Sequence, residues 1–196
     1  MSRYDERTAL VVVDLQNDFA DPAGGLAVAG GVAIIPVVNA AVGEAVDADA
    51  LVVATQDWHP PSTPHFAKDG GIWPVHCVGG TWGAELHPAF TLPAEAPVVR
   101  KGSSGEDGYS GFTMRDPESG EEMPTELEGL LRQRGIERVV VCGLATDYCV
   151  LATALDAVRL GFETSLLADA VAAVNLADGD GEQALDRMRE AGVTLS

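Results

Sequence analysis

The stretch RVVVCGLATDYCV, residues 138–150, joins a short apolar run to a polar turn and then to the start of a helical pattern. Similar runs, rich in Val and Leu and ended by polar or turn residues, recur along the chain. Such runs are typical of strands that are buried in a parallel sheet. The predicted strands are residues 9–13, 51–54, 138–141 and 164–167, a shorter run at 97–100, and an edge strand at 193–195.

Helical patterns lie between several of these runs, at residues 34–46, 125–134, 147–160 and 181–190. Pro36 is compatible with the first of them only near its first turn. Alternating strands and helices predict a three-layer α/β/α fold with a mostly parallel, Rossmann-like sheet of about six strands. Because the chain has no linker, repeat or low-complexity stretch, we expect residues 1–196 to form a single domain.

The composition restricts the classes of function. The chain has 196 residues, of which 46% are hydrophobic, and a formal net charge of −18. This charge argues against nucleic acid and anionic membranes as partners, because both are polyanions. No apolar run approaches the roughly 20 residues that a membrane span needs. The charged start of the chain and an odd number of cysteines favour a cytoplasmic protein.

Polar residues follow the predicted strands where each strand ends. Asp14 follows the first strand, Asp57 and His59 the second, Lys101 the short run at 97–100, and Cys149 the strand at 138–141. Ligands of parallel α/β sheets bind beyond the carboxyl ends of the strands. The sequence therefore predicts that a carboxylate, a pair of possible metal ligands, a lysine and a cysteine meet at the carboxyl edge of the sheet.

Cys149 is the candidate nucleophile. A thiol in the first turn of a helix lies near exposed N–H groups, which favour the thiolate and can also hold an oxyanion. Taken alone, Cys149 also fits a small buried apolar side chain, and Cys142 and Cys77 fit that interpretation better. Asp14 can accept the thiol proton and return it to an amide leaving group, and Lys101 can orient this acid.

The histidines suggest a second kind of chemistry. Asp57 and His59 open a long irregular segment, residues 57–90, which also contains His65 and His76. Long segments without periodic structure in compact domains are usually functional. A mixed nitrogen and oxygen ligand set of this kind suits one divalent ion, Zn²⁺, Fe²⁺ or Mn²⁺.

Five motifs follow one another over nearly the whole chain. They are DLQNDF (14–19), QDWHP (56–60), WPVHCV (73–78), KG (101–102) followed by YSGF (109–112), and GLATDYCV (143–150). Taken together and in this order, they resemble the nicotinamidase/pyrazinamidase family of the isochorismatase-like cysteine hydrolases. The resemblance implies hydrolysis of nicotinamide, and of analogues such as pyrazinamide, in NAD salvage.

The resemblance also implies roles for individual residues. It implies a catalytic triad of Asp14, Lys101 and Cys149, and an oxyanion hole from the main-chain N–H groups of Ala145 and Cys149. It further implies a cis peptide between Leu144 and Ala145. The implied metal ligands are Asp57, His59 and His76, with His65 as a ligand in only some members, and the implied substrate-binding residues are Phe19, Trp73, Tyr109 and Leu144.

Two features depart from the family pattern. The loop 102–112 is about one residue longer than in some relatives, which affects the placement of Tyr109. Tyr148 stands where many members have histidine, and on a helix its side chain is expected to point away from the site.

Two alternative functions remain open at this point. A sister hydrolase, such as an isochorismatase, a maleamate amidase or an N-carbamoylsarcosine amidase, would share the triad but generally lacks the Asp-x-His…His set. A nucleotide-binding or metal-binding module without catalysis is the other, but no G-x-G-x-x-G follows the first strand. We expect a small-molecule partner, and a monomer or homo-oligomer.

Overall fold

The computed structural model describes residues 3–117 and 119–196, and its centre is a parallel sheet of six strands. The strand order is β3-β2-β1-β6-β7-β8, with β1 paired to β2 on one side and to β6 on the other. The predicted fold class is thus confirmed. The strands are β1 (Thr8–Val13), β2 (Leu51–Asp57), β3 (Val98–Lys101), β6 (Arg138–Leu144), β7 (Glu163–Ala172) and β8 (Thr194–Leu195).

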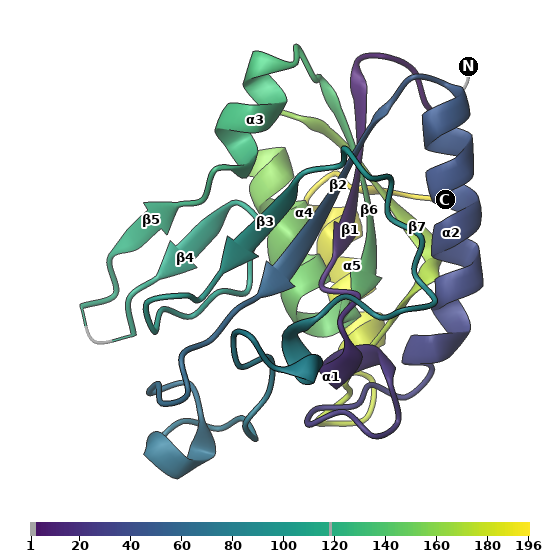
Figure 1. The fold of residues 1–196 in the computed structure, drawn as a ribbon. Coiled ribbons are helices and arrows are strands. Elements are labelled where there is room, and N and C mark those ends of the chain that lie inside the picture. Colours follow the sequence, from purple (N-terminus) through teal and green to yellow (C-terminus); the bar gives the residue numbers. More distant parts are fainter. Residues whose placement is uncertain (1–2, 118) are drawn as a thin grey trace.

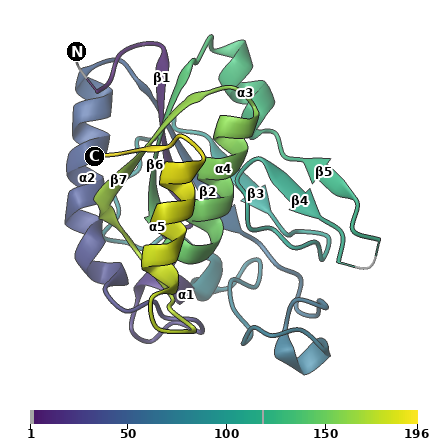
Figure 2. The same ribbon diagram turned by 180° about the vertical axis from the view of Figure 1, so that it is seen from behind.

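Helices cover both faces of this sheet (Figures 1 and 2). The long helix α2 (Gly31–Asp47) packs on one face, beside the short helix α1 (Asn17–Ala20). Among the described residues, the helices that contribute to the core on the other face are α3 (Leu127–Gln133), α4 (Leu151–Arg159) and α5 (Asp180–Glu190). Figure 2 shows α4 and α5 in front of the sheet.

The sequence of strand β1 explains its place in the middle of the sheet. All of its residues are fully buried or nearly so, and alternate side chains enter different cores. Leu10 and Val12 belong to the core under α2, whereas Val11 and Val13 belong to the core under α3, α4 and α5. A strand covered on both faces needs apolar side chains along its length, which residues 9–13 supply. The first residue, Thr8, is polar, and its hydroxyl donates a hydrogen bond to Asp5 Oδ1.

The helix boundaries correct two expectations. Helix α2 begins at Gly31, so Pro36 lies in its second turn and not its first. Pro36 is exposed, and water can satisfy the carbonyl that loses its N–H partner there. The segment predicted as one helix from residue 147 starts as a π-helical turn, Thr146–Val150, before α4 continues it.

A two-stranded antiparallel pair was not predicted. It consists of β4 (Thr113–Arg115) and β5 (Glu122–Pro124), which project from the main sheet (Figure 1). The strands have three residues each and lack a buried alternating pattern, so no periodic signal marks them. Among the residues that the structure describes, no helix is long and apolar enough to cross a membrane.

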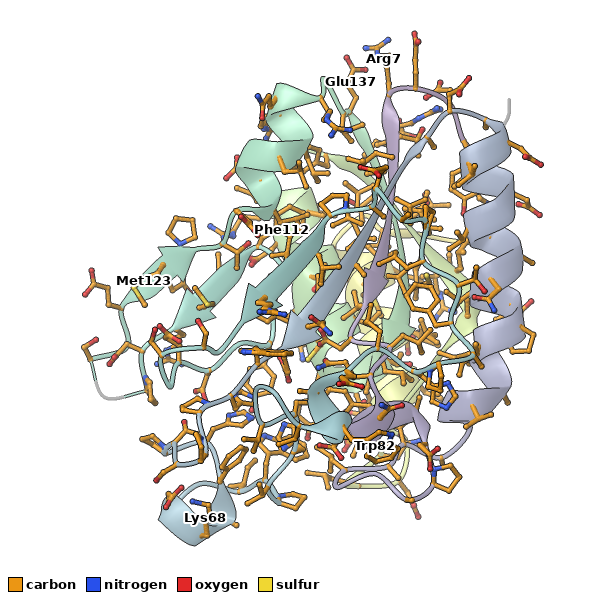
Figure 3. The ribbon with its side chains drawn as sticks, viewed as in Figure 1. Arg7, Lys68, Trp82, Phe112, Met123 and Glu137 are labelled. Atoms are coloured by element: carbon orange, nitrogen blue, oxygen red, sulfur yellow. The ribbon has the colours of Figure 1, made fainter. Side chains whose placement is uncertain are left out.

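The two ends of the sheet have different surroundings (Figure 3). Arg7 and Glu137 form an exposed ion pair at the end where β1 and β6 start. Lys68 and Trp82 lie at the opposite end, in the irregular segment that follows β2. The candidate site lies at this carboxyl end.

Candidate active site

The carboxyl ends of adjacent strands bring the predicted site residues together. Asp57 and Lys101 are the last residues of β2 and β3 and are register partners. Asp14 directly follows β1, and Cys149 lies in the π-helical turn after β6. Ligand atoms of Asp14, Asp57 and Cys149 lie within 4.8 Å of one another.

Lys101 lies at the centre of this group with a fully buried side chain. Its Nζ is 2.7 Å from Asp14 Oδ2 and 3.6 Å from Cys149 Sγ, and it also contacts Asp57 Oδ1. Burial alone would lower the pKa of Lys101, but the carboxylates of Asp14 and Asp57 raise it well above its usual value. The lysine is therefore a buried cation shared by two carboxylates and a thiol.

Asp14 is held in a single orientation. Its φ of 46° lies in the left-handed region, and its Oδ1 accepts a hydrogen bond of 2.6 Å from Thr55 Oγ1. Burial raises the pKa of Asp14 to about 6, against the opposing effect of Lys101. A carboxyl group with such a pKa can both accept and release a proton near neutral pH.

Burial also decides the protonation of Cys149. It raises the pKa of the Cys149 thiol well above its usual value, although the Lys101 ammonium opposes the shift. Loss of solvation at this site thus favours the neutral thiol, in the opposite direction to the effect expected from the helix start. The thiol needs a proton acceptor, and Asp14 is the adjacent carboxylate.

Three histidines from the irregular segment form a cluster beside Asp57. Ligand atoms of His59, His65 and His76 lie within 4.8 Å of one another, and all three side chains are buried. Asp57 Oδ2 is 3.6 Å from His59 Nε2 and 3.9 Å from His76 Nε2. Asp57 thus contacts the lysine with one oxygen and faces the histidines with the other.

This cluster fits a divalent metal ion. Both ring nitrogens of His59 are buried and have no hydrogen-bond partner among the described residues. Burial lowers the pKa of His76 to about 4 and also lowers that of His65, which leaves the neutral imidazole that a metal binds. Despite burial, Lys101 holds the pKa of Asp57 well below its usual range. An ionised carboxylate with neutral imidazoles is a common set for zinc and related ions.

A narrow pocket joins the histidine cluster to Cys149. Phe19, Trp73 and Tyr109, which the resemblance implies as substrate-binding residues, line it, and Trp73 Nε1 donates a hydrogen bond of 2.9 Å to Tyr109 OH. The pocket therefore exposes the thiol and two of the histidines to the same cavity. The complete lining is Phe19, Leu26, Asp57, His65, Trp73, His76, Tyr109, Ala145, Tyr148, Cys149 and Val174.

Two side chains near Cys149, those of Tyr148 and Leu144, do not lie where they were expected. Tyr148 lines the pocket, with its ring 4.8 Å from Trp73, so the expectation that it points away is wrong. The wider π-helical turn changes the directions of successive side chains relative to an α-helix. Leu144 is fully buried in the core under α2 and is not among the lining residues. The peptide between Leu144 and Ala145 is cis, as predicted.

Sequence reasoning missed two lining residues, Leu26 and Val174. Val174 comes two residues after the end of β7. Because ligands bind beyond the carboxyl ends of parallel strands, its position in the sequence could have identified it. Leu26 lies in the loop after α1 and carries no such signal.

Two polar residues of the DLQNDF motif hold the loops of the site in place. Gln16 Nε2 donates to the main-chain oxygen of Asp57 at 2.7 Å, and its Oε1 accepts from the Asp57 N–H at 2.9 Å. Asp18 accepts main-chain hydrogen bonds from Cys77, at 2.7 Å, and from Gly25, at 2.8 Å. The motif thus fixes the backbone around Asp57 and next to His76.

A parallel sheet with a thiol, a carboxylate and an ammonium buried together at its carboxyl edge is the arrangement of a cysteine-dependent hydrolase. The model of the isochorismatase domain family matches residues 8–196, and the chain belongs to this family.

Characterised relatives agree with this assignment. The chain is 44% identical to the nicotinamidase/pyrazinamidase of Mycobacterium tuberculosis over 190 residues, which cover 95% of this chain and 97% of that protein. The structure matches the pyrazinamidase of Pyrococcus horikoshii in complex with zinc, with a TM-score of 0.86, 43% identity and coverage of 97% and 98%. It also matches PnC1 of L. infantum in complex with nicotinate, with a TM-score of 0.88, 38% identity and coverage of 100% and 95%.

Proposed function

We propose that this protein hydrolyses nicotinamide to nicotinate and ammonia, and pyrazinamide in the same way. One observation carries the proposal: a single pocket is lined by Cys149, by His65 and His76, and by several aromatic rings. This is the site for a carboxamide on a flat nitrogen heterocycle. Residues 1–196 act as one hydrolase domain in this proposal, and the reaction belongs to NAD salvage in the cytoplasm.

The first half of the reaction forms a thioester between Cys149 and the acyl group of the substrate, with Asp14 as the proton carrier. Asp14 takes the thiol proton as Cys149 Sγ attacks the carboxamide carbon. The main-chain N–H groups of Ala145 and Cys149 hold the negative oxygen of the tetrahedral intermediate; one such donor is worth about 10²–10³ in rate. Asp14 then gives the proton to the leaving nitrogen, the C–N bond breaks, and ammonia departs.

Hydrolysis of the thioester returns the site to its starting state. Asp14 takes a proton from water as the water oxygen attacks the thioester carbon, and the same N–H groups hold the new oxyanion. The C–S bond then breaks, nicotinate leaves and Cys149 recovers its proton. Lys101 keeps Asp14 oriented and offsets the negative charge that develops in both steps.

Asp57, His59, His76 and His65 would hold a divalent ion in this site. Such an ion would supply a Lewis acid for the ring nitrogen of the heterocycle. Zn²⁺, Fe²⁺ and Mn²⁺ suit the donor set, and the relative in complex with zinc supports Zn²⁺. Phe19 and Trp73 sandwich the substrate ring between them.

An ammonia-release assay tests the proposal. Nicotinamide and pyrazinamide should release ammonia, whereas benzamide, which lacks the ring nitrogen, should be a much poorer substrate. Chelation should abolish turnover of nicotinamide, and added metal should restore it. Faster turnover of maleamate than of nicotinamide would overturn the proposal in favour of a sister hydrolase.

A further inference from the structure

Asp107, in the loop after β3, makes a contact that the mechanism above does not use. Its Oδ1 is 2.9 Å from Nδ1 of His65. The His65 side chain is 5% exposed and that of Asp107 is 29% exposed, so the contact joins a buried imidazole to a partly exposed carboxylate. A carboxylate beside a buried imidazole can determine which ring nitrogen carries the proton.

The backbone around Asp107 is fixed. Its N–H donates to Arg115 O at 2.7 Å, and its carbonyl accepts from the Arg115 N–H at 3.0 Å. Arg115 is the last residue of β4, so the projecting β4–β5 pair supports Asp107 (Figure 1). The carboxylate is therefore held against His65 by regular hydrogen bonding and not by a loose loop.

The three histidines of the cluster differ in what holds them. His76 Nδ1 is 2.7 Å from Pro74 O, and His65 Nδ1 faces Asp107. In both, Nδ1–H donates outwards and the unprotonated Nε2 is left for a ligand. His59 is held by packing: a side-chain carbon at Gly102 would lie 2.7 Å from His59 Cε1.

We propose that Asp107 is a positioning residue of the metal centre, which holds His65 with Nδ1 protonated and Nε2 turned towards His59 and His76. The inference rests on the proposed function, because it takes the histidine cluster to be a metal centre. A carboxylate that receives the outer N–H of a metal-bound histidine fixes its orientation and raises its basicity. Loss of such a partner typically costs about 10–100-fold in metal affinity.

The test is the affinity of the full chain for Zn²⁺, measured by competition with a chromophoric chelator in the absence of substrate. Asp107→Ala should bind Zn²⁺ about 10–100-fold more weakly than the unaltered protein. Asp107→Asn keeps an oxygen that can accept from Nδ1–H and should recover part of this loss. Glu106→Ala is the matched control, because the Glu106 carboxylate accepts from the Ser104 N–H within the same loop. It should leave Zn²⁺ affinity unchanged.

A double-mutant cycle separates positioning from a general effect on the loop. In a His65→Ala background, Asp107→Ala should cause little further loss of Zn²⁺ affinity, because its route to the metal is gone. An equal loss in both backgrounds overturns the inference, as does Asp107→Ala with unchanged affinity.

Zn²⁺ binding and nicotinamide hydrolysis, measured on the same protein, distinguish failure of the inference from failure of the proposed function. If the unaltered protein binds no Zn²⁺, both the inference and the proposed metal centre are wrong. Zn²⁺ binding that depends on Asp107 and His65, without hydrolysis of nicotinamide, would leave the inference standing and remove only the proposed reaction.

Discussion

The two halves of the candidate site are built in different ways. Lys101 ends β3, Asp14 directly follows β1, and Cys149 lies in the turn after β6, so one sheet positions all three. The histidines come from the irregular segment after β2, where isolated contacts replace a sheet. His59, for example, donates its N–H to Cys77 O at 2.9 Å and forms a single bridge with Val78. Strand ends thus place the reacting groups, and a tethered segment places the groups that would hold the metal.

Asp57 joins these halves. It ends β2, contacts Lys101 with one oxygen and faces His59 and His76 with the other. A change in one half can therefore reach the other through this carboxylate. Substitutions can therefore break one half alone or act on both halves through this link.

Cys149→Ala should have the largest effect, because it removes the attacking atom. Ammonia release should fall by about 10⁴-fold or more, while the histidine half, and with it Zn²⁺ content, stays intact. Cys142→Ala is the control: this thiol is buried in β6 and belongs to the core under α2, so turnover should persist. Normal turnover by Cys149→Ala would exclude the thioester route.

Lys101→Met should disturb both halves. It leaves Asp14 and Asp57 buried without their shared cation, and breaking a buried ion pair costs about 3–5 kcal/mol of unfolding free energy. Chemical denaturation measures this loss. Lys68→Met is the control, since Lys68 pairs with Asp69 at the surface and should contribute at most about 1 kcal/mol. Equal stability of the two variants would contradict the central position of Lys101.

His59→Ala should break only the histidine half. Metal content should drop and KM for nicotinamide should rise by about 10–100-fold or more, while Cys149 still reacts with a thiol reagent. His87→Ala is the matched control, because His87 lies outside the cluster and contacts the Ala89 N–H. Retention of a full equivalent of metal by His59→Ala would exclude His59 as a ligand.

Asp18→Ala should have the smallest effect. It leaves the Cys77 N–H next to His76 without its acceptor, which costs about 1–3 kcal/mol of stability. Metal should then be lost at lower chelator concentrations, with kcat unchanged once metal is saturating. Asp21→Ala, which removes a local turn contact to the Ala23 N–H, is the control. A loss in Asp21→Ala as large as in Asp18→Ala would rule out a specific tether.

Several site features were accessible from the sequence because they follow from local rules. Apolar runs indicate strands, and the carboxyl ends of parallel strands meet at one edge, so Asp14, Asp57, Lys101 and Cys149 could be placed together. Tyr148 could not be oriented in this way, because periodicity predicts an α-helix where the structure has a π-helical turn. The support for His65 was also hidden, since β4 and β5 are too short to give a pattern.

The sequence by itself determined the strands of the main sheet, the long helices, their layers and the edge at which the polar residues gather, because these depend on periodicity and on strand direction. Tertiary structure decided how those residues act on one another. The buried lysine contacts a thiol 48 positions away and two carboxylates from neighbouring strands. Its charge, the raised thiol pKa and the shared role of Asp57 all arise from burial and from distances between remote segments, and no local pattern encodes them.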